Sequence, residues 1–423
     1  MADRLRTPSQ PLVILAIALA FLVLFPPVVL DGKYSVLEVA LALVCATLLI
    51  NLRRSPAIRF TAVPTPLIGL LAIMFLSALW SYASWDTLRD ATTFALLALA
   101  ALLITQTAEL NTVMLGVVAG GMLALLWSLL WVVVHPEAGY YPSGAIQGIY
   151  GNRNGFGYVM LQWLPAALVL RFRFPGGIAV KAIVILAVCG AIVASTSVTS
   201  IVVLALVLIA WLALALVRRS WIYGAVIGAI VVVGVIVAFM NFDRTLEIAG
   251  KSASLNGRAK IWNAVLSVVP DSPLVGFGWS RSWQPGSPHS SAVAQSLGGH
   301  IVFHAHDEAL NWLVTTGVIG LLLVTGLYAF VLWAGILVFR ARSTPGAPWI
   351  LLTAIMLIGR GVTEISETSA QGWFILMLIV FAAARYLPSS VKRRPPHWIL
   401  PAGRRDRPPR TQEPHDQGMV VST

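Results

Sequence analysis

The stretch that decides the fold is HAHDEALNWLVTTGVIGLLLVTGLYAFVLWAGILVF, residues 304–339. Two histidines and two carboxylates, at His304, His306, Asp307 and Glu308, stand directly before a long apolar run. An apolar run of about 20 residues is long enough to cross a hydrocarbon core of roughly 30 Å as a helix. The stretch therefore predicts a membrane-spanning helix whose entrance carries side chains capable of chemistry.

The composition of the whole chain repeats this pattern. AVILMFWYC residues make up 58% of the 423 residues and charged residues only 11%, whereas soluble domains carry roughly 25% charge. Apolar runs this long predict helices, because every backbone polar group must be satisfied inside the bilayer. We predict an all-α, polytopic transmembrane helix bundle of about 12 spans. The expected spans are 11–30, 34–51, 66–83, 90–107, 112–134, 155–172, 178–196, 199–217, 221–241, 314–339, 348–365 and 371–387.

The positive charges predict the orientation in the membrane. With the N-terminus in the cytoplasm, 20 of the 29 lysine and arginine residues fall inside, and five of the nine outside lie in one long loop. Short cytoplasmic loops are enriched in basic residues, and long loops weigh little in this rule. We expect both termini in the cytoplasm and a retained first span in a cytoplasmic membrane. The net charge of +12 thus reflects topology and does not indicate nucleic-acid binding.

The sequence divides into two parts. Residues 1–387 are expected to form the membrane domain, with a long extracytoplasmic loop at about 242–305 before the tenth span. Residues 388–423 are rich in proline and arginine, which predicts a disordered basic cytoplasmic tail. Cys45 and Cys189 fall inside expected spans and have neither disulfide nor metal-ligand spacing.

Under this topology the unusual polar residues share the outer side. They comprise Asp86, Arg89, the segment GIYGNRNGFGY at 148–158, STSVTS at 195–200, the long loop, Arg360, Glu364 and Glu367. Most span centres carry no charge, whereas an ion-coupled transporter more often places ionisable residues near the midplane. The pattern favours chemistry at one membrane face.

Two arginines are the first candidate functional residues at that face. Apolar residues after Arg258 recur at helical spacing, which predicts an amphipathic helix ending near Pro270, with Arg258 in its first turn. A guanidinium matches phosphate oxygens and stays charged, so Arg258 is a candidate phosphate ligand or a plain surface arginine. Arg153 at the mouth of a span also suits a phosphate, and Asn154 or its neighbour Asn152 can cap the helix there.

Histidine is the second candidate chemistry. Neutral imidazole accepts a proton near neutral pH, so His304 and His306 are candidate general bases. Two other interpretations are a helix-capping histidine and half of a metal site, although no second cluster of histidine or cysteine completes such a site. Arg360 and Glu364 are four residues apart on an expected helix, so a salt bridge between them is an equal contender to a binding role.

These landmarks together resemble the O-antigen ligase / O-antigen polymerase superfamily of bacterial envelope enzymes. HAHDEALNWLVTTGVIG is similar to the family's His-x-His-Asn signature with its spaced glycines, and Asp307 stands where the usual asparagine would be. LNGRAKIW resembles its Gly-Arg-x-x-x-Trp element, PLVGFGWS its glycine turn, and YGNRNGFGY its entry to a middle span. STSVTS replaces the Ser-Arg-Gly commonly seen after the seventh span.

The resemblance implies transfer of a glycan from a polyprenyl-diphosphate lipid to an acceptor sugar at the outer face, without a cofactor, metal or nucleotide sugar. It implies that Arg258 and Arg153 hold the diphosphate, and that His306 orients or deprotonates the acceptor hydroxyl, with Asp307 or Glu308 setting its tautomer. Whether the enzyme ligates finished chains or polymerises repeats stays open. The alternatives are a transporter or flippase of an envelope precursor, a non-catalytic scaffold and a metal-dependent transferase. The site residues predicted here are His306, Arg258, His304 and Asp307 for catalysis, and Arg153, Asn154, Arg89, Arg360 and Glu364 for substrate binding.

Overall fold

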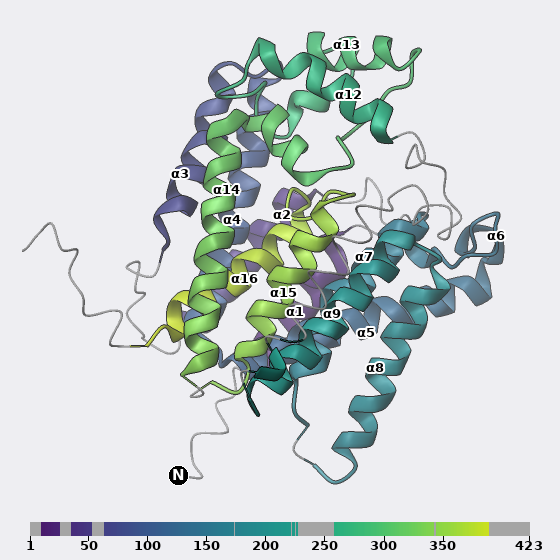
Figure 1. The fold of residues 1–423 in the computed structure, drawn as a ribbon, viewed down its shortest axis with the longest axis vertical. Coiled ribbons are helices and arrows are strands. Elements are labelled where there is room, and N and C mark those ends of the chain that lie inside the picture. Colours follow the sequence, from purple (N-terminus) through teal and green to yellow (C-terminus); the bar gives the residue numbers. More distant parts are fainter. Residues whose placement is uncertain are drawn as a thin grey trace, which may run out of the picture. The chain divides into compact units, whose positions relative to one another are not determined.

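A computed structural model of the chain describes residues 10–25, 35–52, 63–172, 174–220, 222–224, 226, 258–341 and 344–388. These residues fold as helices and, within those ranges, form no strand, so the predicted all-α class is confirmed (Figure 1). The longer helices are α1 (Gln10–Val23), α2 (Val36–Leu52), α3 (Thr65–Leu76), α4 (Ser84–Thr107), α5 (Leu110–Val134), α7 (Arg153–Val169), α8 (Gly177–Ala194), α9 (Val198–Val217), α12 (Arg258–Val268), α13 (Pro288–Ser296), α14 (Glu308–Arg340), α15 (Ala347–Gly361) and α16 (Ala370–Tyr386).

The helices follow the predicted apolar runs. Eleven of the twelve expected spans overlap one of these helices, and the expected span 221–241 lies almost entirely outside the described residues. Five helices, α4, α5, α8, α9 and α14, have the length and hydropathy needed to cross a membrane, and five shorter apolar helices accompany them. The polar segment STSVTS does separate two helices, because α8 ends at Ala194 and α9 begins at Val198. The exact number of spans stays a prediction.

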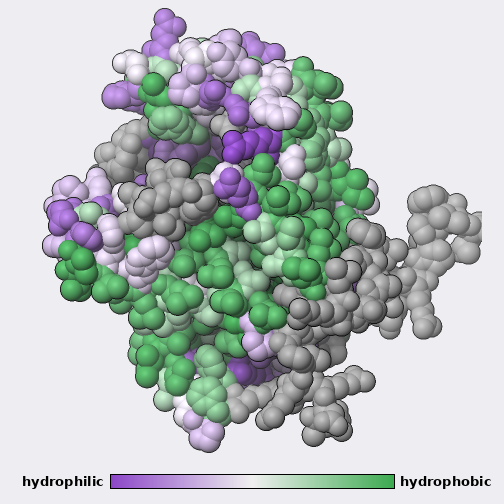
Figure 2. Space-filling view, turned by 180° about the vertical axis from the view of Figure 1, so that it is seen from behind, coloured by the Kyte–Doolittle hydropathy of each residue, from purple (hydrophilic) through white to green (hydrophobic). Residues whose placement is uncertain are grey.

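Helix α16 lies at the centre of the bundle. All but three of its residues are buried, and it packs against α4, α14 and α15. Around this centre, α1 packs on α5, α2 on α4, and α7 on α5, α8 and α15. Many apolar side chains on the outer helices remain exposed, among them Leu186 and Leu322. Figure 2 shows hydrophobic side chains over the middle of one face, with hydrophilic side chains at its upper end. A lipid-facing surface accounts for this distribution.

The described part of the predicted long loop is itself folded. Residues 258–305 form α12, α13 and short 3-10 turns, which cover one end of α14 (Figure 1). Helix α12 begins at Arg258 and ends at Val268, as its amphipathic pattern predicts, and buries Val265 against Val293 and Val314. Residues 242–257, and the tail from 389 to 423, lie outside the described residues.

Helix α14 is broken at Gly317, where φ is 67° and ψ is −168°. The turn at residues 273–278 docks into this break. Phe277 N and Gly278 N donate to the carbonyls of Val314 and Thr315 at 2.8 and 2.9 Å. The carbonyls of residues 273 and 274 accept from the amides of residues 318 and 319 at 2.9 and 3.1 Å. Because a Cβ on Gly317 would lie 2.2 Å from a backbone atom of the turn, only glycine fits there. The four backbone hydrogen bonds formed at this break hold the α12–α13 segment against α14.

Candidate active site

Four separate parts of the chain meet beside the N-terminal end of α14. They are the histidine segment before α14, the first residue of α12, the beginning of α7, and the segment 362–369 that joins α15 to α16. This arrangement brings together Arg258, His306, Asn154 and Glu364, which lie far apart in the sequence. Four of the predicted site residues therefore share one location, and Arg89 and Arg153 do not join this group.

Glu364 is the centre of the cluster. Its Oε1 forms an ion pair with Arg258 Nη2 and accepts a hydrogen bond from Asn154 Nδ2 at 3.4 Å. Its Oε2 lies 3.2 Å from His306 Nδ1. Burial alone would raise the pKa of Glu364, but the hydrogen bond from His306 and the charges of Arg360 and Arg258 lower it to about 2. The carboxylate is therefore ionised at neutral pH and can only accept hydrogen bonds.

The geometry around Glu364 assigns the tautomer of His306. Since the ionised carboxylate can only accept, His306 Nδ1 carries a hydrogen and points it at Glu364. In a neutral ring this leaves Nε2 with its lone pair free to take a proton. The predicted orienting partners were Asp307 and Glu308, and the structure corrects this: the partner is Glu364, 58 residues further along the chain.

His304 contacts both the backbone and the ring of His306. His306 has a φ of 51°, in the left-handed region that few non-glycine residues occupy. Its backbone N–H donates to His304 Nδ1 at 3.2 Å, and the two rings lie edge to face at 4.0 Å. Burial, with the neighbouring His306, lowers the pKa of His304 to about 4. His304 is therefore neutral at pH 7 and acts as a hydrogen-bond acceptor.

Arg360 is the second buried cation of the cluster. Only 4% of its surface is exposed. Its Nε donates to the carbonyl of Ile365 at 3.1 Å, and its guanidinium carbon lies 3.7 Å from the centre of the Tyr158 ring. Its Nη1 is buried and has no hydrogen-bond partner among the described residues. A buried charged donor without an acceptor is costly, so an anionic ligand at this point would satisfy it.

The salt bridge between Arg360 and Glu364, one of the two alternatives drawn from their spacing, does not form. The two residues are not on one helix, because α15 ends at Gly361. The segment beyond Gly361 turns the Glu364 carboxylate toward α12, where its ion pair is with Arg258. A spacing of four residues predicts a contact only while the helix continues.

The side chains of Asp307 and Glu308 both accept hydrogen bonds from backbone amides. Asp307 Oδ1 caps α14 by accepting from Leu310 N at 2.8 Å. Glu308 is buried and accepts from the backbone amides of Ser366 and Thr368 at 2.6 and 2.9 Å. Glu308 thereby ties the histidine segment to the segment that carries Glu364. Burial raises the pKa of the neighbouring Asp307, against the hydrogen bonds from backbone amides.

Two predicted ligands lie apart from the Glu364 cluster. Arg153 Nη1 donates to Thr196 Oγ1 at 3.1 Å, and its guanidinium lies 5.1 Å from the centre of the Tyr141 ring. It stands at the start of α7, one residue before Asn154. Arg89 lines a separate hollow together with Ser280. The structure thus places Arg153 beside the cluster and Arg89 in another hollow.

The two histidines and Glu364 could also hold a cation. One ligand atom from each of His304, His306 and Glu364 lies within 4.8 Å of the others. Residue types alone did not reveal this group, because the completing ligand is a distant glutamate rather than a histidine or cysteine. The electrostatics oppose a metal ion, since Glu364 is already paired with Arg258 and a second cation, Arg360, lies nearby.

Sequence reasoning missed Tyr158 as part of this site. Its ring lies under the Arg360 guanidinium, and its hydroxyl donates to the carbonyl of Ser366 at 2.8 Å. Tyr158 is four residues after Asn154 on α7, so helical periodicity places both on one face. That spacing was the signal that could have indicated a shared role.

Comparisons with known proteins agree with the resemblance drawn from the motifs. A family model described as O-Antigen ligase matches residues 182–325, from within α8 to within α14. The exopolysaccharide production protein ExoQ of Rhizobium meliloti (strain 1021) is 28% identical over 269 residues, which cover 58% of this chain and 59% of that protein. The match thus spans about three fifths of the curated relative. Both findings confirm the similarity to the O-antigen ligase superfamily and support a role in polysaccharide biosynthesis by a membrane protein.

Proposed function

We propose that this protein transfers a glycan from a polyprenyl-diphosphate lipid to an acceptor hydroxyl at the outer face of the cytoplasmic membrane. The observation that carries the proposal is the Glu364 cluster, in which one ionised carboxylate joins a histidine to an arginine beside a second buried arginine. The family match and the relative's printed role in exopolysaccharide production support the substrate class.

In this reaction His306 is the general base. Glu364 holds the ring through Nδ1, so Nε2 accepts the proton of the acceptor hydroxyl. The acceptor oxygen then bonds to the anomeric carbon of the donor, and the bond from that carbon to the diphosphate oxygen breaks. Glu364 also stabilises the imidazolium that forms, because opposite charges lie in contact.

The arginines receive the leaving diphosphate, which departs with the electron pair of the broken bond. Arg360 Nη1 is a buried donor without a partner among the described residues. The described hydrogen bonds of Arg258 involve Nη2 alone, so its other N–H groups can reach a second phosphate oxygen. Fixed cations at the developing charge stabilise it without reorganising at the moment of reaction. A metal ion is not required in this scheme, and Arg153 at the edge of the cluster meets the glycan or the outer phosphate.

The test uses purified protein in lipid nanodiscs with a synthetic polyprenyl-diphosphate glycan and an acceptor sugar. Release of polyprenyl diphosphate and growth of the glycan are both measured. Removing a general base costs about 10²–10⁴-fold in rate, so His306→Ala and Glu364→Gln should each lose at least about 10²-fold. Arg340→Gln is the matched control, because Arg340 ends α14 at its opposite end. Near-normal transfer by His306→Ala and Arg258→Ala would refute the assignment.

A deletion strain separates ligation from polymerisation and from transport. Accumulated single repeats on the carrier lipid would indicate a polymerase, and accumulated long chains would indicate a ligase. Loss of the surface glycan, with the precursor held on the inner leaflet, would instead support a flippase. Complementation with His306→Ala restores a transporter's phenotype and leaves an enzyme's phenotype unrescued.

A further inference from the structure

A basic hollow lies at the end of the bundle away from the Glu364 cluster. Helices α7 and α9 begin beside the cluster and α15 ends there, whereas the hollow is built from the last residues of α7 and α9 and the first residues of α15. Its volume is about 330 Å³. The proposed glycan transfer does not use it, so its chemistry stands independently of that proposal.

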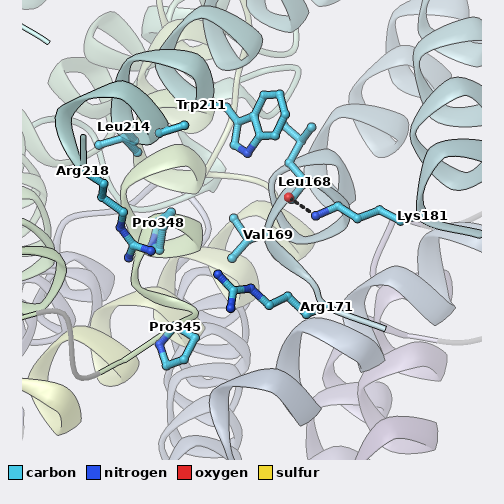
Figure 3. Close-up of a pocket in the computed structure, with 10 residues that line it drawn as sticks. Leu168, Val169, Arg171, Lys181, Trp211, Leu214, Arg218, Pro345 and Pro348 are labelled. Atoms are coloured by element: carbon cyan, nitrogen blue, oxygen red, sulfur yellow. Dashed lines mark hydrogen bonds between the residues drawn. The ribbon is translucent and has the colours of Figure 1, made fainter. Parts of the chain in front are cut away.

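Three cations surround the hollow, and none of its lining residues is acidic. Arg171 follows α7, Lys181 is in the second turn of α8, and Arg218 caps the end of α9. Figure 3 shows the guanidinium groups of Arg171 and Arg218 pointing toward one another across the hollow. No carboxylate of the described ranges lies within ion-pair distance of Arg171 or Lys181. An anion beside Arg171 and Lys181 would offset the repulsion between these two like charges.

The cations are held in place by neighbouring groups. Lys181 Nζ donates to the carbonyl of Leu168, in the last turn of α7, at 2.6 Å. The guanidinium of Arg218 lies 4.8 Å from the centre of the Phe339 ring. Arg171, by contrast, has an exposed side chain. Two anchored cations and one exposed cation are consistent with a site prepared for a ligand, rather than with charges that merely face solvent.

The remaining walls are apolar. Trp211 and Leu214 of α9 and Pro348 of α15 lie beside the cations (Figure 3). A free phosphate ion has no apolar part that could contact these side chains. A lipid, by contrast, can place its phosphate among the cations and its acyl chain along the apolar side chains. Basic hollows between membrane helices bind anionic headgroups in this way, and a partly exposed tryptophan suits the depth of the headgroups.

We infer that this hollow binds the phosphate headgroup of an anionic membrane lipid, with Arg171 and Arg218 as the phosphate ligands and Trp211 against the acyl chain. The test measures retention of phosphatidylglycerol, phosphatidylcholine and inorganic phosphate by the purified full-length protein, using native mass spectrometry and thermal shifts. Both lipids carry a phosphate, but the cationic choline of phosphatidylcholine would be repelled by the three cations of the hollow. Phosphatidylglycerol should therefore bind at least about tenfold more tightly than phosphatidylcholine, a difference of about 1.4 kcal/mol.

The variant Arg171→Gln/Arg218→Gln should weaken phosphatidylglycerol binding by about tenfold for each arginine. The control Arg219→Gln/Arg340→Gln removes the same charge from basic residues that do not line the hollow, and it should bind like the unchanged protein. Equal losses in both pairs would overturn the site in favour of general surface attraction. Equal retention of the two lipids by the unchanged protein, or binding of inorganic phosphate as tight as that of phosphatidylglycerol, would also overturn it.

Discussion

Replacing Gly317 with alanine should disrupt the contact between the α12–α13 segment and α14. The φ and ψ of 67° and −168° lie in a region that is essentially restricted to glycine and costs other residues about 1–3 kcal/mol. The new Cβ would also lie 2.2 Å from the backbone of Leu274, so the 273–278 turn must move. Its four backbone hydrogen bonds to α14 are worth about 0.5–1.5 kcal/mol each. The expected loss is about 3–9 kcal/mol, a large share of the stability of an ordinary domain.

The assay is unfolding of the purified protein in detergent, followed by thermal midpoint and by denaturant titration. Gly326→Ala is the matched control, because Gly326 is on the same helix and its Cβ would meet only Pro66, at 3.6 Å. Alanine exceeds glycine in helix propensity by about 0.8–1.0 kcal/mol, so the control should unfold at the same or a higher temperature. Equal midpoints for the two variants would refute the reasoning.

A second substitution checks the cause. A Cβ on Gly276 would lie 2.6 Å from the backbone of Thr315, so Gly276→Ala strains the same interface from the other side. Changes that act on one contact are not additive. The double variant Gly276→Ala/Gly317→Ala should therefore lose less stability than the two single losses added together. Strict additivity would show that the two glycines act on separate parts of the structure.

Three further predictions concern the cluster itself. Glu308→Ala leaves the buried amides of residues 366 and 368 without their acceptor and should lower the free energy of unfolding by about 2–6 kcal/mol. A denaturant midpoint equal to that of the unchanged protein would contradict a stabilising role for these two hydrogen bonds. Because the pKa of His304 is lowered to about 4 from about 6.5 when unfolded, the unfolded chain takes up a proton between those pH values that the folded chain does not. Stability should therefore fall as the pH drops from about 6.5 to 4, and His304→Gln should flatten that slope in thermal unfolding. Chelation with EDTA should leave transfer unchanged, because Arg258 already neutralises Glu364; a loss restored by added metal would favour the metal site instead.

The sequence by itself determined the helices and the chemistry they carry. Apolar runs of membrane length predict helices wherever they occur, since no other open structure satisfies the backbone in lipid. The interruptions at residues 148–158 and 195–200 and the polar entrance of the 304–339 stretch therefore locate helix ends. Arg258 at the start of α12 follows from the amphipathic pattern behind it. These inferences depend only on local periodicity.

Only the tertiary structure decided which of these residues are partners. Glu364 pairs with Arg258, 106 residues away, and with His306, instead of with Arg360 four residues away. That choice depends on where α15 ends and how the next segment turns against α12 and α14, and no local pattern contains it. The same holds for Gly317, where a break in α14 becomes necessary because another segment's backbone occupies the space a side chain would need. Close packing between distant segments sets both outcomes.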